Sequence, residues 1–276
     1  MRIELHCHST ASDGRLTPTQ LLDLAASRNV TALALTDHDT IAGHAEAMTA
    51  GLAHTIRVIG GIEVSTLFEG KEAHILGYGV RPSDDATRAT LDALRSVRQS
   101  RARGMLSKLA ELGVHVSYER VRALAGDGML GRPHIARAML EAGVVTSIQD
   151  AFDRYLAEGK SAFVANDALT PGEAAALIHR AHGCVVLAHP GLFNGKFDAL
   201  FQRLLEAGLD GIETYYPEHN ASQMDAFAAL ARTHGLIATG GSDFHAENGR
   251  HAAALGDMQL PDGCLAALDA RIARYA

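Results

Sequence analysis

Short apolar runs alternate with amphipathic stretches along both flanks of the chain. Residues 31–36 and 184–188 are continuous apolar runs of the length of buried strands, whereas residues 17–28 begin with Thr-Pro and space their leucines as a helix does. Residues 64–67 and 72–79 flank a Glu-Gly-Lys turn, which predicts a β-hairpin. The alternation predicts an α/β protein built on a parallel sheet or barrel.

The middle of the chain lacks this alternation of strands and helices, and its apolar residues are spaced as in helices only. Four helices are predicted, over residues 84–112, 118–125, 133–141 and 148–156. We therefore expect one unit made of residues 1–82 and 166–276, with residues 83–165 as a helical insert that covers the active site. The first helix of the insert carries a basic face, which is either a solvated surface or a surface that meets anions: Arg95, Arg98, Arg101, Arg103 and Lys108.

Composition limits the class of protein. With 276 residues, 47% of them hydrophobic, the chain can bury a sizeable core. We find neither an apolar run near the roughly 20 residues of a membrane span nor a signal-peptide pattern, and the three scattered cysteines do not predict disulfides, so we expect a cytoplasmic protein. A net charge of −7 argues against non-specific coating of DNA.

Side chains that bind metals recur where the predicted strands end. His6 and His8 alternate along the first strand, so both should point to one face while Cys7 points away. Alone, such a pair is commonly two partly exposed histidines at a terminus. Four later strand ends also carry acids or imidazoles, and strand ends meet at one face of a barrel, so we interpret them as one site: Asp37-His38, Glu63, His189, and Asp243 with His245.

The candidate donors exceed what one tetrahedral ion needs. They are six imidazoles (His6, His8, His38, His74, His189, His245) and three carboxylates (Asp13, Glu63, Asp243). This set predicts two or three divalent ions, with a carboxylate such as Glu63 bridging a pair. Nitrogen and oxygen donors without thiolates suit Mn²⁺, our first choice, or Zn²⁺ or Fe²⁺. Whether Asp37 or Asp39 contributes stays open.

These motifs resemble those of the PHP (polymerase and histidinol phosphatase) family over about residues 1–80 and 170–250. The resemblance implies a distorted (β/α)7 barrel, similar to a TIM barrel, with a trinuclear metal site. It implies three ligand sets: His6, His8, Glu63 and Asp243; Glu63, His74 and His189; and Asp13, His38 and His245. Asp13 stands where many members of the family carry a histidine.

The insert resembles one branch of that family. Arg98, Arg101 and residues 131–136 are similar to members that act as 3′,5′-nucleoside bisphosphate phosphatases or as 5′–3′ exoribonucleases on short RNA. Independently, the planar fork of arginine suits phosphate, and Arg132 precedes a proline that starts a helix, where backbone amides are positive. His134 and His219 are further candidates for substrate binding.

We therefore expect a metal-dependent phosphatase that removes the 3′-phosphate of a nucleoside 3′,5′-bisphosphate, such as adenosine 3′,5′-bisphosphate. Glu63, Asp13 and His189 are the expected catalytic residues, and a hydroxide bridging two ions would attack phosphorus in line.

The alternatives are an exoribonuclease on short 5′-phosphorylated RNA and a histidinol-phosphate phosphatase. A barrel that hydrolyses amides or lactones would not need the arginines. A non-catalytic metal- or RNA-binding module is the remaining alternative, but the chain lacks the interleaved aromatic side chains typical of proteins that bind single strands, with an aromatic content of only 5%. The expected partner is a small nucleotide or a short RNA, and no membrane.

Overall fold

The seven strands follow one another around the sheet in chain order. The structure, a computed structural model, describes residues 1–81, 85–165, 169–247 and 253–276. The strands are β1 (Arg2–Cys7), β2 (Val30–Leu35), β3 (Arg57–Phe68), β4 (Lys71–Tyr78), β5 (Cys184–Leu187), β6 (Gly211–Tyr215) and β7 (Ile237–Gly240). Only β4 runs antiparallel to its neighbours within these described strands.

The ends of the sheet meet, which makes it a barrel. Cys7 at the end of β1 forms a parallel bridge with Phe244, which follows β7, and the His8 amide donates to the Phe244 carbonyl at 2.9 Å. The predicted α/β fold with a seven-stranded, TIM-like barrel is thereby confirmed. In barrels of this kind the side chains at the carboxyl ends of the strands share one rim, so the predicted strand-end residues are brought together.

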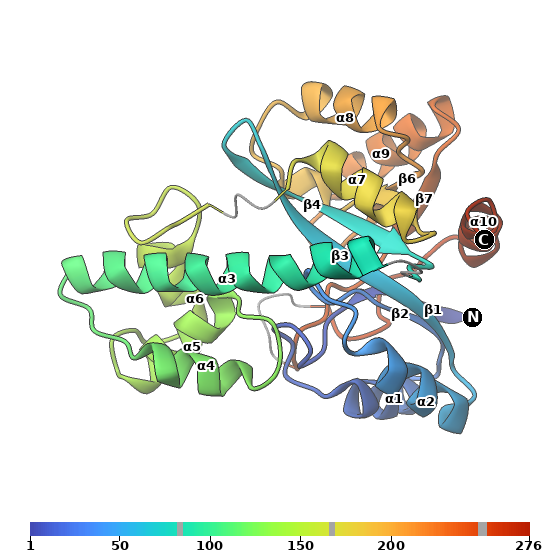
Figure 1. The fold of residues 1–276 in the computed structure, drawn as a ribbon. Helices are drawn as coiled ribbons and strands as arrows, with labels where there is room; N and C mark the ends of the chain where they lie inside the picture. Colours follow the sequence, from blue (N-terminus) through green and yellow to red (C-terminus); the bar gives the residue numbers. More distant parts are fainter. Residues whose placement is uncertain (82–84, 166–168, 248–252) are drawn as a thin grey trace.

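Helices cover the outside of the barrel. They are α1 (Pro18–Ser27), α2 (His44–His54), α7 (Pro171–Arg180), α8 (Phe197–Glu206), α9 (Ala221–Thr233) and α10 (Cys264–Ile272). Figure 1 shows α1 and α2 on one side of the strands and α7, α8 and α9 on the other, with α10 beside both termini. Among the described helices none combines the length and apolarity needed to cross a bilayer.

Local sequence explains where these helices begin. Thr17 caps α1 by accepting from the Gln20 amide, and the Gln20 side chain accepts from the Thr17 amide, which forms a capping box at the start of the predicted helix. The next helix, α2, begins at His44, after a turn in which the His44 amide donates to the Ile41 carbonyl.

The side chains of β1 do not alternate regularly between the two faces of the sheet. Leu5 and Cys7 are both fully buried, but Leu5 packs with strand residues and α10, whereas Cys7 packs with α1 and α2. The pairing of β1 with β2 has a register shift between Glu4 and Cys7, which explains the change of side. Cys7 nevertheless points away from the cluster, since its thiol donates to the Ala34 carbonyl at 3.2 Å.

The predicted hairpin is confirmed and is longer than expected. Its first arm belongs to β3, which begins at Arg57, continues to Phe68 and then turns into β4. Glu63 therefore lies within a strand, next to the end of β2, where it forms a bridge with His38.

The insert is helical and has its own apolar cluster. It contains α3 (Asp85–Glu111), α4 (Tyr118–Ala125), α5 (Arg132–Glu141), α6 (Ile148–Ala151) and a π-helix (Phe152–Leu156), so residues 148–156 are helical as predicted, with their second half wound as a π-helix. Met105, Leu109, Val121, Ile135 and Met139 pack together there, and Figure 1 shows these helices extending from one end of the strands. The boundaries predicted at residues 82–83 and 166 lie outside the described residues.

Candidate metal centre

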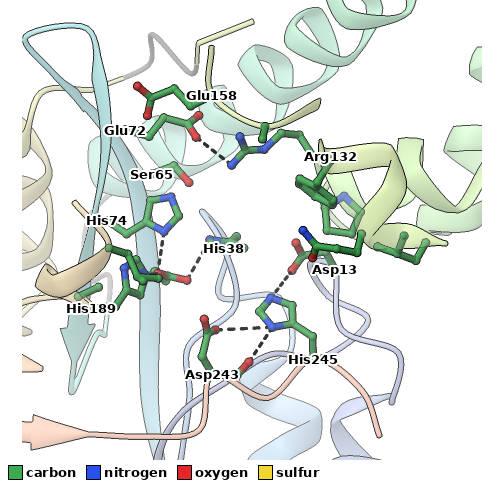
Figure 2. Close-up of a pocket in the computed structure, with 18 of the residues that line it drawn as sticks. Asp13, His38, Ser65, Glu72, His74, Arg132, Glu158, His189, Asp243 and His245 are labelled. Atoms are coloured by element: carbon green, nitrogen blue, oxygen red, sulfur yellow. Dashed lines mark hydrogen bonds and ion pairs between the residues drawn. The ribbon is translucent and has the colours of Figure 1, made fainter. Parts of the chain in front are cut away.

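The predicted strand-end residues converge at the rim of the barrel. Figure 2 shows His38, His74, His189, Asp243, His245 and Asp13 around one space, although β1, β3, β4 and the loops after β2, β5 and β7 supply the cluster. His6, near the end of β1, and His8, directly after it, are fully buried and their rings lie 5.2 Å apart, so the two imidazoles are close together as expected.

Glu63 is the centre of the cluster, and its two oxygens face different imidazoles. Oε1 lies 2.9 Å from His74 Nδ1 and 2.9 Å from His189 Nε2. Oε2 lies 3.3 Å from the Nε2 atoms of both His6 and His8 and 3.1 Å from His38 Nδ1. A carboxylate divided in this way is placed to bridge two ions, as the sequence predicts for this residue.

Three groups of donor atoms are close enough to hold one ion each. They are His6, His8, Glu63 and Asp243; His38, Glu63 and His74; and His8, Asp13, His38 and His245, each with atoms within 4.8 Å of one another. The first group equals the first predicted ligand set. The second group contains His38 where the predicted set has His189, and the third group adds His8 to Asp13, His38 and His245. The individual assignments stay predictions.

The nitrogen and oxygen atoms of the cluster are of the kinds that bind a divalent metal ion. Several buried ligand atoms have no hydrogen-bond partner in the described part of the chain: His6 Nε2, His8 Nε2, Asp13 Oδ1, His38 Nδ1 and Glu63 Oε2. Leaving a buried polar atom unsatisfied costs about 1–3 kcal/mol, so a set of them directed at one space indicates a bound group that satisfies them. Imidazole nitrogens and carboxylate oxygens are suited to first-row divalent ions.

The pKa shifts in the cluster also indicate a site for a cation. Burial disfavours charge on His8, yet the contacts with Asp243 and Glu63 raise the pKa of its ring to about 10. Burial also disfavours charge on Glu63, but the imidazoles of His38 and His6 hold the pKa of its carboxyl well below the usual range. The Glu63 carboxylate is thus held as an anion beside a protonated His8 ring, and a cation can take the place of that proton.

A second layer of buried carboxylates, which the sequence reasoning missed, supports the ligands. Glu213 on β6 is fully buried; its Oε1 lies 2.8 Å from His6 Nδ1, and its Oε2 accepts from the His189 amide at 2.8 Å. A carboxylate only accepts, so His6 donates through Nδ1 and turns the lone pair of Nε2 toward Glu63. Tyr216 similarly donates to Asp243 Oδ2 at 2.9 Å.

Glu4 is the other residue that sequence reasoning missed. It is fully buried and accepts from the amides of His6, Ser242 and Gly256, which joins the first strand to the segment that carries Asp243. A charged residue inside an otherwise apolar strand was the available signal for both Glu4 and Glu213.

The aspartates on either side of His38 support the site rather than face it. Asp37 accepts from Ser9 and Ser12, with distances of 2.6–2.8 Å. Asp39 accepts from the Ser65 amide at 2.8 Å and pairs with Arg98 at 2.6 Å. Both carboxylates are therefore engaged with protein groups.

A cavity of about 890 Å³ opens onto the cluster. Its walls come from the barrel (including Glu63, His189 and Phe193) and from the insert (including Arg132 and Phe152). The volume lies toward the upper end of the range for small-molecule sites. The insert therefore forms part of the pocket that contains the donors.

Two of the predicted substrate arginines face this cavity together. Arg132 Nη2 lies 2.8 Å from Glu72 Oε2, and Arg101 pairs with Glu72 Oε1 (Figure 2 shows the first of these pairs). Burial lowers the pKa of the Arg101 guanidinium to about 10, which keeps it charged at neutral pH. Opposite charges on Arg132 and Arg101 outweigh burial and lower the pKa of the Glu72 carboxyl.

The other predicted substrate residues have structural partners. Arg98 is buried and donates to Asp39, to Ser65 Oγ at 2.8 Å and to the Leu130 carbonyl at 3.2 Å. His134 is buried; its Nδ1 accepts from the Gly131 amide at 3.0 Å, and burial lowers its pKa to about 4. In His219, Nδ1 bonds to the Thr214 carbonyl and Nε2 accepts from the Gly191 amide. These contacts hold the walls of the site, and a substrate role for these three stays a prediction.

The comparison with known families decides the identity of the fold. The PHP domain family matches residues 4–163, which is more than half of the chain. The chain belongs to the PHP domain family. The resemblance of the sequence motifs to the PHP family is confirmed, and so is the expectation that the protein is a metal-dependent phosphoesterase.

Relatives of known function agree with this PHP assignment. A 3′,5′-nucleoside bisphosphate phosphatase of Chromobacterium violaceum is 38% identical over 285 residues, covering 99% of each chain. A 5′-3′ exoribonuclease of Haemophilus influenzae is 39% identical over 247 residues, covering 88% of this chain and 90% of that protein. A solved structure of an amidohydrolase from Chromobacterium violaceum, with bound sulfate and no metal, superimposes with a TM-score of 0.88 at 35% identity, covering 98% of this chain and 97% of the other.

Proposed function

We propose that this PHP protein hydrolyses the 3′-phosphate of nucleoside 3′,5′-bisphosphates, with Mn²⁺ as the preferred metal. The observation that carries the proposal is the position of Glu63, divided between two sets of imidazoles in a cavity that also contains Arg101 and Arg132. A cluster of donors alone would serve any hydrolysis, but a guanidinium pair in the same cavity favours a substrate with a second phosphate. The similarity to the Chromobacterium violaceum phosphatase over the whole chain supports the same substrate class.

Three sets of residues would hold the ions. His6, His8, Glu63 and Asp243 would bind the first, and Glu63 with His74 and His189 the second. Asp13, His38 and His245 would bind the third. When bound, the ions would supply Lewis acidity, which lowers the pKa of water and neutralises charge on the phosphoryl oxygens.

The remaining chemistry falls to protein groups. Arg101 and Arg132 would hold the phosphate that is not cleaved and so orient the ester bond toward the cluster. Asp13 Oδ1, buried and 3.3 Å from His245 Nε2, would accept a proton from the attacking water. His189, fixed by the hydrogen bond of its amide to Glu213, would hold its Nε2 beside Glu63 Oε1 and so keep the second ligand set in place, while the leaving oxygen would take its proton from water.

A 5′–3′ exoribonuclease activity is the second candidate. The cavity of about 890 Å³ has room beyond one nucleotide, and the Haemophilus influenzae relative carries that activity in its name. We expect the protein to act in the cytoplasm, where its three buried, free cysteines would stay reduced.

The test is release of inorganic phosphate after removal of metal and reconstitution with Mn²⁺ or Zn²⁺. We expect release from adenosine 3′,5′-bisphosphate to exceed that from AMP, histidinol phosphate and 5′-phosphorylated RNA, and to stop when a chelator is added. Glu63→Gln should lower turnover on the order of 10²–10³-fold or more while the protein stays folded. Release from AMP alone, or a variant with near-native turnover, would refute the proposal.

A further inference from the structure

The arginine pair of the cavity is already occupied by a carboxylate of the protein itself. Glu72 lies between Arg101 and Arg132 and offers one oxygen to each. Its side chain is 10% exposed, and it lines the same cavity as the candidate metal ligands. In Figure 2, Glu72 meets Arg132 above His74 and His38. A planar carboxylate held in this way makes the contacts that a phosphate would make with the same forks.

Strand β4 places the Glu72 carboxylate next to the candidate metal ligand His74. Glu72 and His74 are two residues apart on β4, and the alternation of buried Ala73 and Ile75 with half-buried Glu72 and His74 puts the latter two on the cavity side. Two residues of a strand advance about 6.7 Å. Glu72 and the candidate ligand His74 thus line neighbouring parts of one cavity. A substrate with its 3′-phosphate at the cluster can therefore direct its other phosphate toward Arg101 and Arg132.

The arginines do not depend on Glu72 for their positions. Arg101 Nε donates to the Val164 carbonyl at 2.7 Å, and both guanidinium groups lie 5.7 Å from the centre of the Phe163 ring. Arg132 also lies 5.9 Å from the Phe152 ring. These cation–π and backbone contacts would hold the two forks in place if the carboxylate moved away.

We propose that Glu72 is an internal competitor for the second phosphate, which the 5′-phosphate of the substrate displaces from Arg101 and Arg132. The inference rests on the proposed function and adds a residue that sets specificity. A phosphate dianion carries more charge than a carboxylate and displaces it, whereas a neutral or weakly charged group does not. The same competition weakens the binding of the product, since the returning carboxylate helps to expel a nucleoside 5′-monophosphate.

The experiment compares Glu72→Gln with Glu158→Gln in the metal-loaded protein. Gln keeps the shape of the side chain but removes its charge, and Glu158 loses the same charge from the same cavity while its own partner is Lys71, at 2.6 Å. AMP affinity is measured by titration calorimetry, and KM and kcat are measured with adenosine 3′,5′-bisphosphate. Thermal unfolding checks that both variants are folded.

We expect Glu72→Gln to tighten AMP binding about tenfold, the effect of removing one competing charged contact, and to lower KM by a similar factor without raising kcat. Glu158→Gln should change both by less than about twofold, as is usual for a partly exposed pair. Weaker or unchanged AMP binding in Glu72→Gln, or an equal gain in Glu158→Gln, would overturn the inference. A wild-type protein that binds AMP but releases phosphate from no substrate would instead refute the proposed function, and the AMP titration would still decide the role of Glu72.

Discussion

The contact between Glu213 and His6 gives the sharpest prediction about metal binding. In Glu213→Gln, an amide NH₂ group can meet His6 Nδ1 in place of a carboxylate oxygen 2.8 Å away. The ring then has to accept at Nδ1 and carry its proton on Nε2, the atom that faces Glu63 and Asp243. A protonated Nε2 has no lone pair for a metal.

The expected loss follows from the size of such support contacts. Replacing a partner that orients a metal-binding histidine typically costs 10–100-fold in metal affinity, which corresponds to about 1.4–2.7 kcal/mol. Because Glu213 also accepts from the His189 amide, we expect the upper half of that range. Mn²⁺ affinity is measured by competition with a chelator of known affinity, and turnover is recorded over a range of Mn²⁺ concentrations.

A matched control separates this effect from loss of stability. Asp210 is a buried carboxylate directly before the same strand, and it bonds to Val185 and Tyr275 far from the cluster. Asp210→Asn should lower stability without changing metal affinity. Glu213→Gln with metal affinity within twofold of the wild type would show that the imidazole does not depend on Glu213, and the reasoning would fail.

Two further predictions concern stability. Arg98→Ala leaves the buried Asp39 carboxylate without its charged partner and should cost about 3–5 kcal/mol in denaturant unfolding; a higher KM with unchanged stability would show instead that Arg98 serves the substrate. Contacts with His179, Val185 and Tyr275 outweigh burial and lower the pKa of Asp210, so its contribution is present above the unfolded pKa of about 3.9 and is lost as pH falls through the folded value. The deficit of Asp210→Asn, about 1–3 kcal/mol at pH 7, should therefore shrink in acid, and a deficit that is constant with pH would contradict this account.

The sequence predicted what local periodicity and ligand chemistry determine. His6 and His8 face one cluster, as alternation predicts, although the register shift in β1 puts Leu5 and Cys7 on different sides, and the strand ends meet because the strands form a barrel. The capping of α1 by Thr17 is equally local. These features depend on few residues, so a pattern in the chain suffices to predict them.

Partner choice could not be predicted, because it depends on three-dimensional packing. Arg98 and Arg101 are three residues apart on one helix and look alike in the sequence, yet Arg98 pairs with buried Asp39 and Arg101 with Glu72 in the cavity. Glu213 was missed for a related reason, since only the closed barrel brings β6 to His6. The π-helix likewise replaces a regular turn that the apolar spacing alone predicts.

The closure of the barrel at Phe244 has a consequence for biosynthesis. The bridge from Cys7 to Phe244 joins β1 to the segment that follows β7, and His6, His8, Asp243 and His245 lie on either side of it. During synthesis, His6 and His8 therefore exist before Asp243 and His245 do. Until residue 245 has left the exit tunnel of the ribosome, the first two imidazoles have only part of their final surroundings. We therefore expect the ligand set of His6, His8, Glu63 and Asp243 to be complete only after that segment docks against β1.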